Sequence, residues 1–223
     1  MSAVSLVPRL RNCPNRDPSP ILKLNRLSRQ FTLLVSLALV TGCASRPVSQ
    51  LPDIDDWEVR QQVLAAADDW EFSGRIAVSA DEDGFNGKLR WTQDEDRFLA
   101  TVSGPLGIGT VRIEGEGQRA VLTDKDGERT ELRNVEADLL YRYGWTIPVK
   151  SLRYWALGIP DPAEDAQTEL NDDNQMARLE QGGWTVGISS YRISSGQSMP
   201  NRLSAKNSST RVRIVIDKWK FFD

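Results

Sequence analysis

One cysteine of the chain stands in a context that suits a specific covalent reaction. Cys43 directly follows Val40, Thr41 and Gly42. The small residues Thr41 and Gly42 let a peptidase bind the chain in an extended form, and the Cys43 thiol can then form a thioether with diacylglycerol. The four residues therefore predict a lipobox, the cleavage and lipidation signal of bacterial lipoproteins, with Cys43 as the lipidated N-terminus.

The segment before Cys43 has the composition of a secretory leader. Residues 31–40 form an apolar run that is too short to span a bilayer, and basic residues precede it within 23–29. A buried strand or helix with a chance cysteine is the alternative, but the polar run 45–50 indicates a tether. The predicted organisation is a signal peptide at 1–42, a lipidated N-terminus and tether at 43–52, and a single domain at 53–223.

The residue after the predicted lipidation site bears on the destination of the protein. Lipoproteins that stay at the inner membrane usually carry aspartate in this place, whereas Ala44 stands here. Resemblance to bacterial lipoproteins therefore implies a lipid anchor in the inner leaflet of the outer membrane, with the domain on its periplasmic face.

The side chains that catalyse many hydrolytic reactions are missing. The chain has no histidine, and of its two cysteines Cys13 leaves with the leader while Cys43 is acylated. Ser-His-Asp and Cys-His catalysis, the usual zinc sites and a disulfide are therefore excluded. Adjacent aspartates occur in three pairs, but neighbouring side chains diverge and do not form an acid and base pair. We expect no enzyme, no metal, and no cofactor besides the covalent lipid on Cys43.

The charge balance limits the partners. Residues 1–42 contain six of the 28 basic residues and one of the 31 acidic residues, so the remaining 181 residues carry 22 and 30, a net charge of −8. This balance argues against a nucleic-acid partner and indicates no polybasic patch for anionic lipid. A chain of this length suffices for one domain with a substantial core.

The segment 103–110 is the most unusual part of the domain, because Leu106 and Ile108 stand among glycines and Pro105 between two predicted strands. The spacing of its glycines resembles a phosphate-binding loop, but the lysine is missing and a strand follows. One interpretation is a hairpin whose Leu106 folds back into the core. The other is an exposed apolar tip that touches a membrane or a lipid.

The elements that must position these residues follow from hydrophobic periodicity. Helices are predicted at 53–69 with Asp55 as its cap, at 136–143 ending at Gly144, and at 149–157 ending at Gly158. Residues 161–174 are predicted to form an acidic loop. Alternating apolar and polar residues separated by turn signals predict strands at 73–80, 85–92, 97–103, 109–115, 118–123, 128–132, 176–181, 184–191, 201–206 and 210–221.

These elements predict a mainly β fold in the α+β class. About ten or eleven antiparallel strands form one meandering sheet, which twists and curls so that its apolar face becomes concave. Either the curl closes and fills with side chains, or part of the concavity stays open for an apolar ligand. The tryptophans are mostly core residues in this interpretation, and a minority of them line a lipid pocket.

The combination of lipobox, leading helix, meander, apolar loop and helix pair resembles the LolB family, whose members receive lipoproteins from the periplasmic carrier LolA and insert them into the outer membrane. The resemblance covers nearly all of the chain after the leader. It rests on Gly74-Arg75, Leu89-Arg90-Trp91, Gly104-Pro105-Leu106-Gly107, the run from Ile147 to Pro160, Met199-Pro200 and Asp217-Lys218-Trp219.

The resemblance implies an open, incomplete barrel, with short helices over its mouth and a hydrophobic cavity for acyl chains. Trp91, Trp155 and Leu152 are the candidates for its lining. Leu106 stands at the key leucine of the membrane-delivery loop, while Ile108 is an added large apolar residue. The implied partners are a LolA-like carrier and acylated lipoprotein cargo, bound by a monomer. A lipid-anchored scaffold or polymer-binding domain with a filled core is the alternative, and a hydrolase a weaker one.

Overall fold

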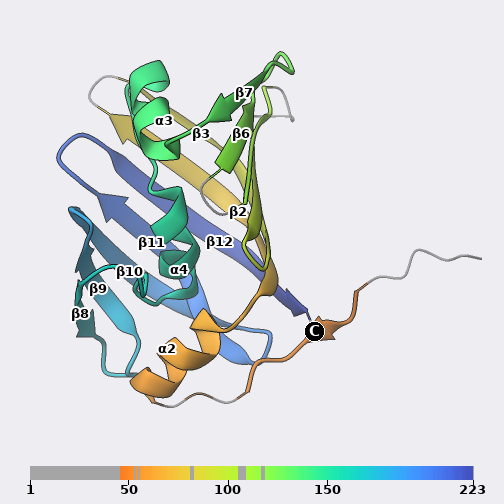
Figure 1. Ribbon diagram of the computed structural model, residues 1–223. Coiled ribbons are helices and arrows are strands. Elements are labelled where there is room, and N and C mark those ends of the chain that lie inside the picture. Colours follow the sequence, from red (N-terminus) through yellow and green to blue (C-terminus); the bar gives the residue numbers. More distant parts are fainter. Residues whose placement is uncertain are drawn as a thin grey trace, which may run out of the picture. The chain divides into compact units, whose positions relative to one another are not determined.

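The computed structural model describes residues 46–222, except residues 53, 55, 81–82, 105–108 and 117–118. Residues 46–223 form one compact unit, and an antiparallel sheet dominates it (Figure 1). The predicted lipidation site Cys43 and the loop residues Pro105, Leu106 and Ile108 lie outside the described residues. The predictions about these four residues therefore stay predictions.

The described residues form three helices and twelve strands. The helices are α2 (Trp57–Ala65), α3 (Val135–Tyr143) and α4 (Val149–Leu157). In this part of the chain, no helix combines the length and the hydrophobicity that are needed to cross a membrane. The strands are β1 (Val48–Ser49), β2 (Asp69–Ala80), β3 (Asp83–Asp94), β4 (Arg97–Ser103), β5 (Val111–Glu116), β6 (Arg119–Thr123), β7 (Arg129–Leu132), β8 (Ala166–Leu170), β9 (Met176–Gln181), β10 (Trp184–Ser194), β11 (Gln197–Lys206) and β12 (Arg211–Phe222).

The sheet is a meander in the order β7-β6-β5-β4-β3-β2-β12-β11-β10-β9-β8, and β1 adds to the end of β12. The two edge strands, β7 and β8, do not pair with each other, so the barrel is incomplete. The chain crosses from one edge to the other through α3 and α4, which lie over the concave face of the sheet (Figure 1). The open antiparallel fold predicted from the sequence is confirmed.

Alternation along the central strands places the core on the concave side. On β12, Val212, Ile214 and Ile216 are buried while Arg211 and Arg213 between them are exposed, as expected for a strand with one face in the core and one in water. The register then joins Val212 to Val78 and Ile214 to Ile76 on β2. Burial of apolar residues on both strands fixes this register, because a slip by one residue would expose every one of them.

Gly74 allows β2 and β12, two of the three longest strands, to approach closely. It pairs with Ile216, directly before an irregularity in the register of β12. A Cβ atom on residue 74 would lie only 2.0 Å from the backbone oxygen of Val215. Glycine is therefore required here by packing, which accounts for the Gly74-Arg75 pair singled out in the sequence.

The two helices over the concave face end where they were predicted to end, and α4 also begins at the predicted residue, whereas α3 begins at Val135, one residue earlier than predicted. Asn134 caps α3 by accepting a hydrogen bond from the backbone N–H of Ala137 at 3.1 Å. Gly144 and Gly158 end α3 and α4 in the left-handed conformation, with φ of 71° and 81°. Both glycines serve as C-caps because this conformation is strained for residues with a Cβ atom.

Two predictions about the elements were wrong. The first helix is shorter than the range 53–69, because Asp56 rather than Asp55 caps it, at 3.1 Å from the Val59 N–H, and β2 already begins at Asp69. The predicted acidic loop 161–174 contains the edge strand β8, which pairs with β9. Its exposed polar side chains hide the alternation that marks the other strands. Within the predicted tether, Val48 and Ser49 form β1.

Candidate functional site

An apolar cavity of about 300 Å³ lies between the concave face of the sheet and the helix segment that crosses it. No acidic or basic side chain is among the residues that line it, so its wall favours a hydrocarbon ligand over a charged one. The lining comes from the five strands β2 to β6, from both ends of the loop 105–108, and from α3, α4 and the segment between them: Ile76, Phe85, Asn86, Leu89, Trp91, Ala100, Val102, Gly104, Gly109, Val111, Ile113, Leu122, Tyr143, Trp145, Ile147, Val149 and Leu152.

Three aromatic residues join the sheet to the end of α3 at one part of this wall. The ring of Trp145 lies 4.9 Å from that of Phe85 and 5.4 Å from that of Tyr143, between ring centroids. Phe85 and Trp145 are partly buried, and Tyr143 is exposed. This side of the cavity therefore reaches the surface. Tyrosine and tryptophan, each with one polar end, suit such a boundary between an apolar interior and water.

The ends of the glycine-rich loop belong to the same wall. Gly104 and Gly109 both line the cavity, and residues 105–108 between them lie outside the described residues. Leu106 is therefore two residues from a position on the cavity wall.

Trp91, one of the three predicted lining residues, lies in the wall of this cavity and is held rigidly. Its indole N–H donates to Oε1 of Gln93 at 3.1 Å, and Nε2 of Gln93 in turn donates to the backbone oxygen of Glu95 at 2.7 Å. The ring stacks on Phe98 at 5.3 Å and on Trp70 at 6.4 Å. A satisfied polar edge and packed neighbours leave the apolar surface of Trp91 to form part of the cavity wall.

Leu152 also lines the cavity, and α4 positions it. Six residues of this helix are buried, Leu152 among them. At the start of the helix the Ser151 hydroxyl donates to Oδ2 of Asp161 at 3.0 Å, a buried hydrogen bond. Because α4 is fixed at its start and along one face, Leu152 is a permanent part of the wall.

The third predicted lining residue, Trp155, lies elsewhere. Its indole N–H donates to Oε1 of Gln181 at 2.9 Å, and its ring packs on Trp184 at 6.2 Å. It is buried in the packed core beside β9 and β10 and does not line the cavity. Trp155 and Leu152 lie only three residues apart on α4, but they face different parts of the interior. Leu152 faces the open cavity, whereas Trp155 packs against side chains of β9 and β10.

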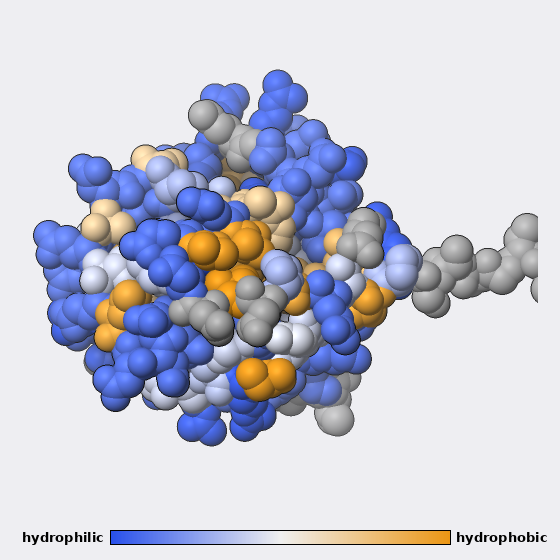
Figure 2. All heavy atoms as spheres, turned by 90° about the horizontal axis from the view of Figure 1, so that it is seen from below, coloured by the Kyte–Doolittle hydropathy of each residue, from blue (hydrophilic) through white to orange (hydrophobic). Residues whose placement is uncertain are grey.

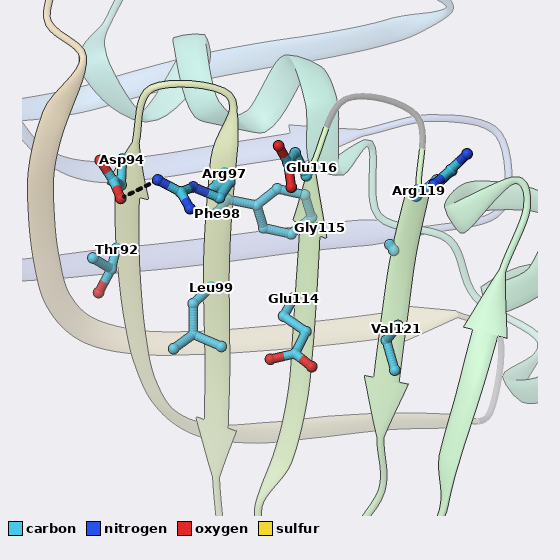
Figure 3. Close-up of a pocket in the computed structure, with 11 residues that line it drawn as sticks. Thr92, Asp94, Arg97, Phe98, Leu99, Glu114, Gly115, Glu116, Arg119 and Val121 are labelled. Atoms are coloured by element: carbon cyan, nitrogen blue, oxygen red, sulfur yellow. Dashed lines mark hydrogen bonds and ion pairs between the residues drawn. The ribbon is translucent and has the colours of Figure 1, made fainter.

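A larger hollow, of about 830 Å³, lies on the outer side of the sheet over β3 to β6 (Figure 3). It is a shallow, charged surface: Arg97 pairs with Asp94 at 3.2 Å, and Glu114, Glu116 and Arg119 are nearby. Its size exceeds that of the apolar cavity, but exposed carboxylates and guanidinium groups do not favour an acyl chain. We therefore place the candidate site on the concave face.

Hydrophobic side chains also gather at the end of the unit that carries α2 (Figure 2). Val59 on α2 and Ile193 near the end of β10 are exposed. Buried Arg60 fixes α2 to the sheet, since it donates to the backbone oxygen of Ser198 at 2.6 Å and lies 5.6 Å from the centroid of the Tyr191 ring. This surface does not belong to the lining of the cavity.

The site also contains Phe85, Tyr143 and Trp145, which were not predicted from the sequence. Phe85 had a usable signal, because it begins the alternating series that includes Trp91. Trp145 and Tyr143 flank Gly144, the residue that ends α3, and nothing local distinguishes such a position from a packed core position. Only the path of the chain between α3 and α4 places them next to Phe85.

Comparison with known proteins identifies the family. Residues 68–219 match the family described as outer membrane lipoprotein LolB. An outer-membrane lipoprotein LolB of Pseudomonas paraeruginosa is 32% identical over 197 residues, 86% of this chain and 96% of that protein. The outer-membrane lipoprotein LolB of Francisella tularensis is 30% identical over 124 residues. The match spans 55% of this chain and only 60% of that protein.

Solved structures with very different sequences share the fold. A LolA superfamily protein from Nitrosomonas europaea has a TM-score of 0.51 at 9% identity, over 75% of this chain and 94% of its own. A DUF1329 family protein from Desulfovibrio piger has a TM-score of 0.50 at 7% identity, over 73% of this chain and 89% of its own. The family match over most of the domain and the nearly full-length Pseudomonas relative show that this chain belongs to the LolB family.

Proposed function

We propose that this protein is anchored in the outer membrane by a lipid on Cys43, receives acylated lipoproteins from a LolA-like periplasmic carrier, and inserts them into the membrane. The apolar cavity is the observation that carries the proposal. Its wall is uncharged and its lining includes Trp91, Leu152 and the ends of the loop 105–108. At about 300 Å³ it lies at the small end of the volumes usual for small-molecule sites.

The physical need for such a cavity follows from the cargo. Exposing an acyl chain to water costs about 0.8 kcal/mol per methylene, so a lipoprotein needs cover between membranes. The proposed transfer is driven by differential affinity: the cavity binds acyl chains more tightly than the carrier does, and the membrane binds them more tightly than the cavity. This mechanism uses binding alone and no catalytic group.

The loop between Gly104 and Gly109 is the proposed delivery element. Leu106 is its apolar tip, Pro105 restricts the backbone before it, and Ile108 adds a second apolar side chain. Burying one such side chain in the bilayer contributes about 1.5 to 3 kcal/mol, enough to bias release of cargo toward the membrane. A core leucine would behave differently, because its removal costs about 2 to 5 kcal/mol of stability.

The test is a two-step transfer assay with Leu106→Glu. Lipoprotein-loaded carrier is mixed with the lipidated protein in vesicles, and binding to the protein and insertion into the bilayer are measured separately. We expect Leu106→Glu to keep its melting temperature within a few degrees and to accept cargo, but to fail in insertion. Ile108→Glu should show a milder form of the same defect.

Two outcomes contradict this proposal. If Leu106→Glu unfolds or accepts no cargo, the residue belongs to the core or to the cavity rather than to a delivery tip. If the unsubstituted protein neither accepts cargo nor binds a fluorescent fatty acid, a lipid-anchored scaffold with an unused cavity explains the chain better than a receptor.

A further inference from the structure

Basic residues collect on the outer face of the four adjacent strands β3, β2, β12 and β11. Six exposed cations on this face form no ion pair with another described residue. We call these six residues, together with Arg75, the basic face. The six are Lys88, Arg202, Lys206, Arg211, Arg213 and Lys218. The expectation from net charge that the protein has no polybasic patch is therefore wrong.

The register sets like charges opposite each other within the basic face. Arg75 on β2 pairs with Lys88 on β3, and Lys206 on β11 pairs with Arg211 on β12. Like charges in directly opposite positions destabilise a sheet. Among the described residues only one carboxylate relieves either pair, since Oδ1 of Asp217 lies 3.1 Å from Arg75. The fold itself gains nothing from this arrangement, which points to an anionic partner outside the domain.

The strands leave a hollow of about 460 Å³ within the basic face. Arg75, Lys88 and Arg213 line it, and small residues such as Ala77 form part of the same lining. Several cations around a recess that small side chains keep open suit a phosphate group, which accepts charge-assisted hydrogen bonds from arginine and lysine.

Two connections place the basic face beside a membrane. Gly104 lines both the hollow and the apolar cavity, so the hollow adjoins the base of the apolar loop. In addition, β1 pairs with Phe221 and Phe222, at the opposite end of β12 from Arg211 and Arg213, so the two connections lie at the two ends of the basic face. Only two residues separate Cys43 from Arg46, and three residue steps span at most about 11 Å, so a lipid on Cys43 keeps the domain close to the bilayer.

We propose that the basic face docks on the anionic phospholipid headgroups of the membrane, with the hollow between Arg75, Lys88 and Arg213 accepting a headgroup phosphate. The inference rests on the proposed anchoring at Cys43 and adds an orientation: the outer face of β12 and its neighbours lies along the membrane surface. Attraction of this kind weakens with salt and scales with the anionic lipid content.

Acetylation of lysines tests the orientation directly. The lipidated full chain is reconstituted in vesicles of phosphatidylcholine alone and in vesicles that also contain phosphatidylglycerol. The rate at which each lysine is acetylated is then measured by mass spectrometry. We expect the labelling of Lys88, Lys206 and Lys218 to fall about fivefold or more in the anionic vesicles, because each cation near an anionic surface changes partition by about that factor. The exposed lysines Lys125 and Lys150 serve as internal controls and should not change.

A charge-reversed double variant provides the second arm. Lys88→Glu with Arg213→Glu should abolish the protection of Lys206 and Lys218 in anionic vesicles. The control Arg112→Glu with Arg119→Glu changes the net charge equally at exposed residues of β5 and β6, and it should keep that protection. High salt should remove the protection in the unsubstituted protein.

Three results overturn the inference. They are equal labelling in both kinds of vesicle, protection that survives in Lys88→Glu with Arg213→Glu, and protection that arises only when the carrier is added. The third result would mark the basic face as a surface for an acidic protein. Cargo insertion measured in the same vesicles separates this inference from the proposed function, because insertion without protection of the three lysines refutes the docking surface alone.

Discussion

At the scale of single residues, the cavity exists because a small side chain stands between large ones. Ala100 on β4 pairs with Trp91 on β3 and with Ile113 on β5, and all three line the cavity. Trp91 cannot move to fill the space, since its indole is hydrogen-bonded and stacked. The space over Ala100 is therefore a property of one residue and its fixed neighbours.

Ala100→Phe should block the cavity without unfolding the protein. The added ring fills apolar space that is empty of protein atoms, so we expect uptake of a fluorescent fatty acid to fall at least tenfold while the free energy of unfolding changes by less than about 1.5 kcal/mol. Fluorescence titration and denaturant unfolding measure the two quantities.

The matched control is Ala177→Phe on β9, which adds the same volume outside the cavity lining. It should leave uptake unchanged. Normal uptake by Ala100→Phe would mean that the acyl chain binds elsewhere.

At the scale of elements, the two helices over the mouth are held very differently. On α4 six residues are buried, whereas on α3 only Leu139 is. Tyr141 on α3 is 91% exposed, and Leu140 and Tyr143 are exposed as well. Since α3 ends at the aromatic residues of the cavity wall, the part of the cover that is least held by packing is next to the opening.

Glu136, in the first turn of α3, weakens the hold on this helix further. Partial burial raises its pKa, the carboxylate of Glu164 raises it further, and Lys150 opposes both effects. The folded-state pKa thus lies above the ordinary value of 4.5. The folded protein binds the proton more tightly than the unfolded chain does, so stability from this group is lost as the pH rises through the raised pKa.

Glu136→Gln should therefore stabilise the protein at neutral pH, by no more than about 0.5 kcal/mol given the remaining exposure of the group to water. The gain should shrink as the pH falls below the raised pKa, because the glutamate is then uncharged in the folded protein too. Thermal unfolding across this pH range measures the effect. Glu131→Gln, at an exposed position of β7, is the control, and an equal gain there would assign the effect to net charge instead of burial.

At the scale of the whole molecule, the proposed lipid anchor and the domain would have separate tasks. The family match covers residues 68–219, within the compact unit 46–223, whereas the proposed lipid attachment lies before that unit. The basic face and the apolar cavity occupy opposite sides of the same sheet. A single curved sheet thus presents a charged surface and an apolar one without a second domain.

Cys43→Ala should change the location of the protein and leave its fold intact. Without the thiol no diacylglycerol can be attached, so we expect a precursor in the inner membrane, or a soluble periplasmic form if another peptidase trims the leader. Membrane fractionation measures this outcome, with Cys13→Ala as the control that should fractionate normally. Outer-membrane fractionation of Cys43→Ala would contradict the lipobox.

Sequence alone was sufficient for the features that depend on near neighbours along the chain. Residues such as Gly144 and Gly158 end helices through their own backbone conformation, and alternation on β12 follows from one face in water and one in the core. The type and order of most elements could be predicted for that reason. Strand β8 was missed because an edge strand exposed to water has no alternation to detect.

Features that depend on distant segments were decided by the tertiary structure. Trp91 and Trp155 looked alike in the sequence, yet one lines the cavity and the other packs on Trp184, because the difference depends on which strands lie beneath α4. Likewise, the net charge of −8 gave no sign of the basic face. The pairing of four strands brings its lysines and arginines together, since register, and not composition, determines which charges become neighbours.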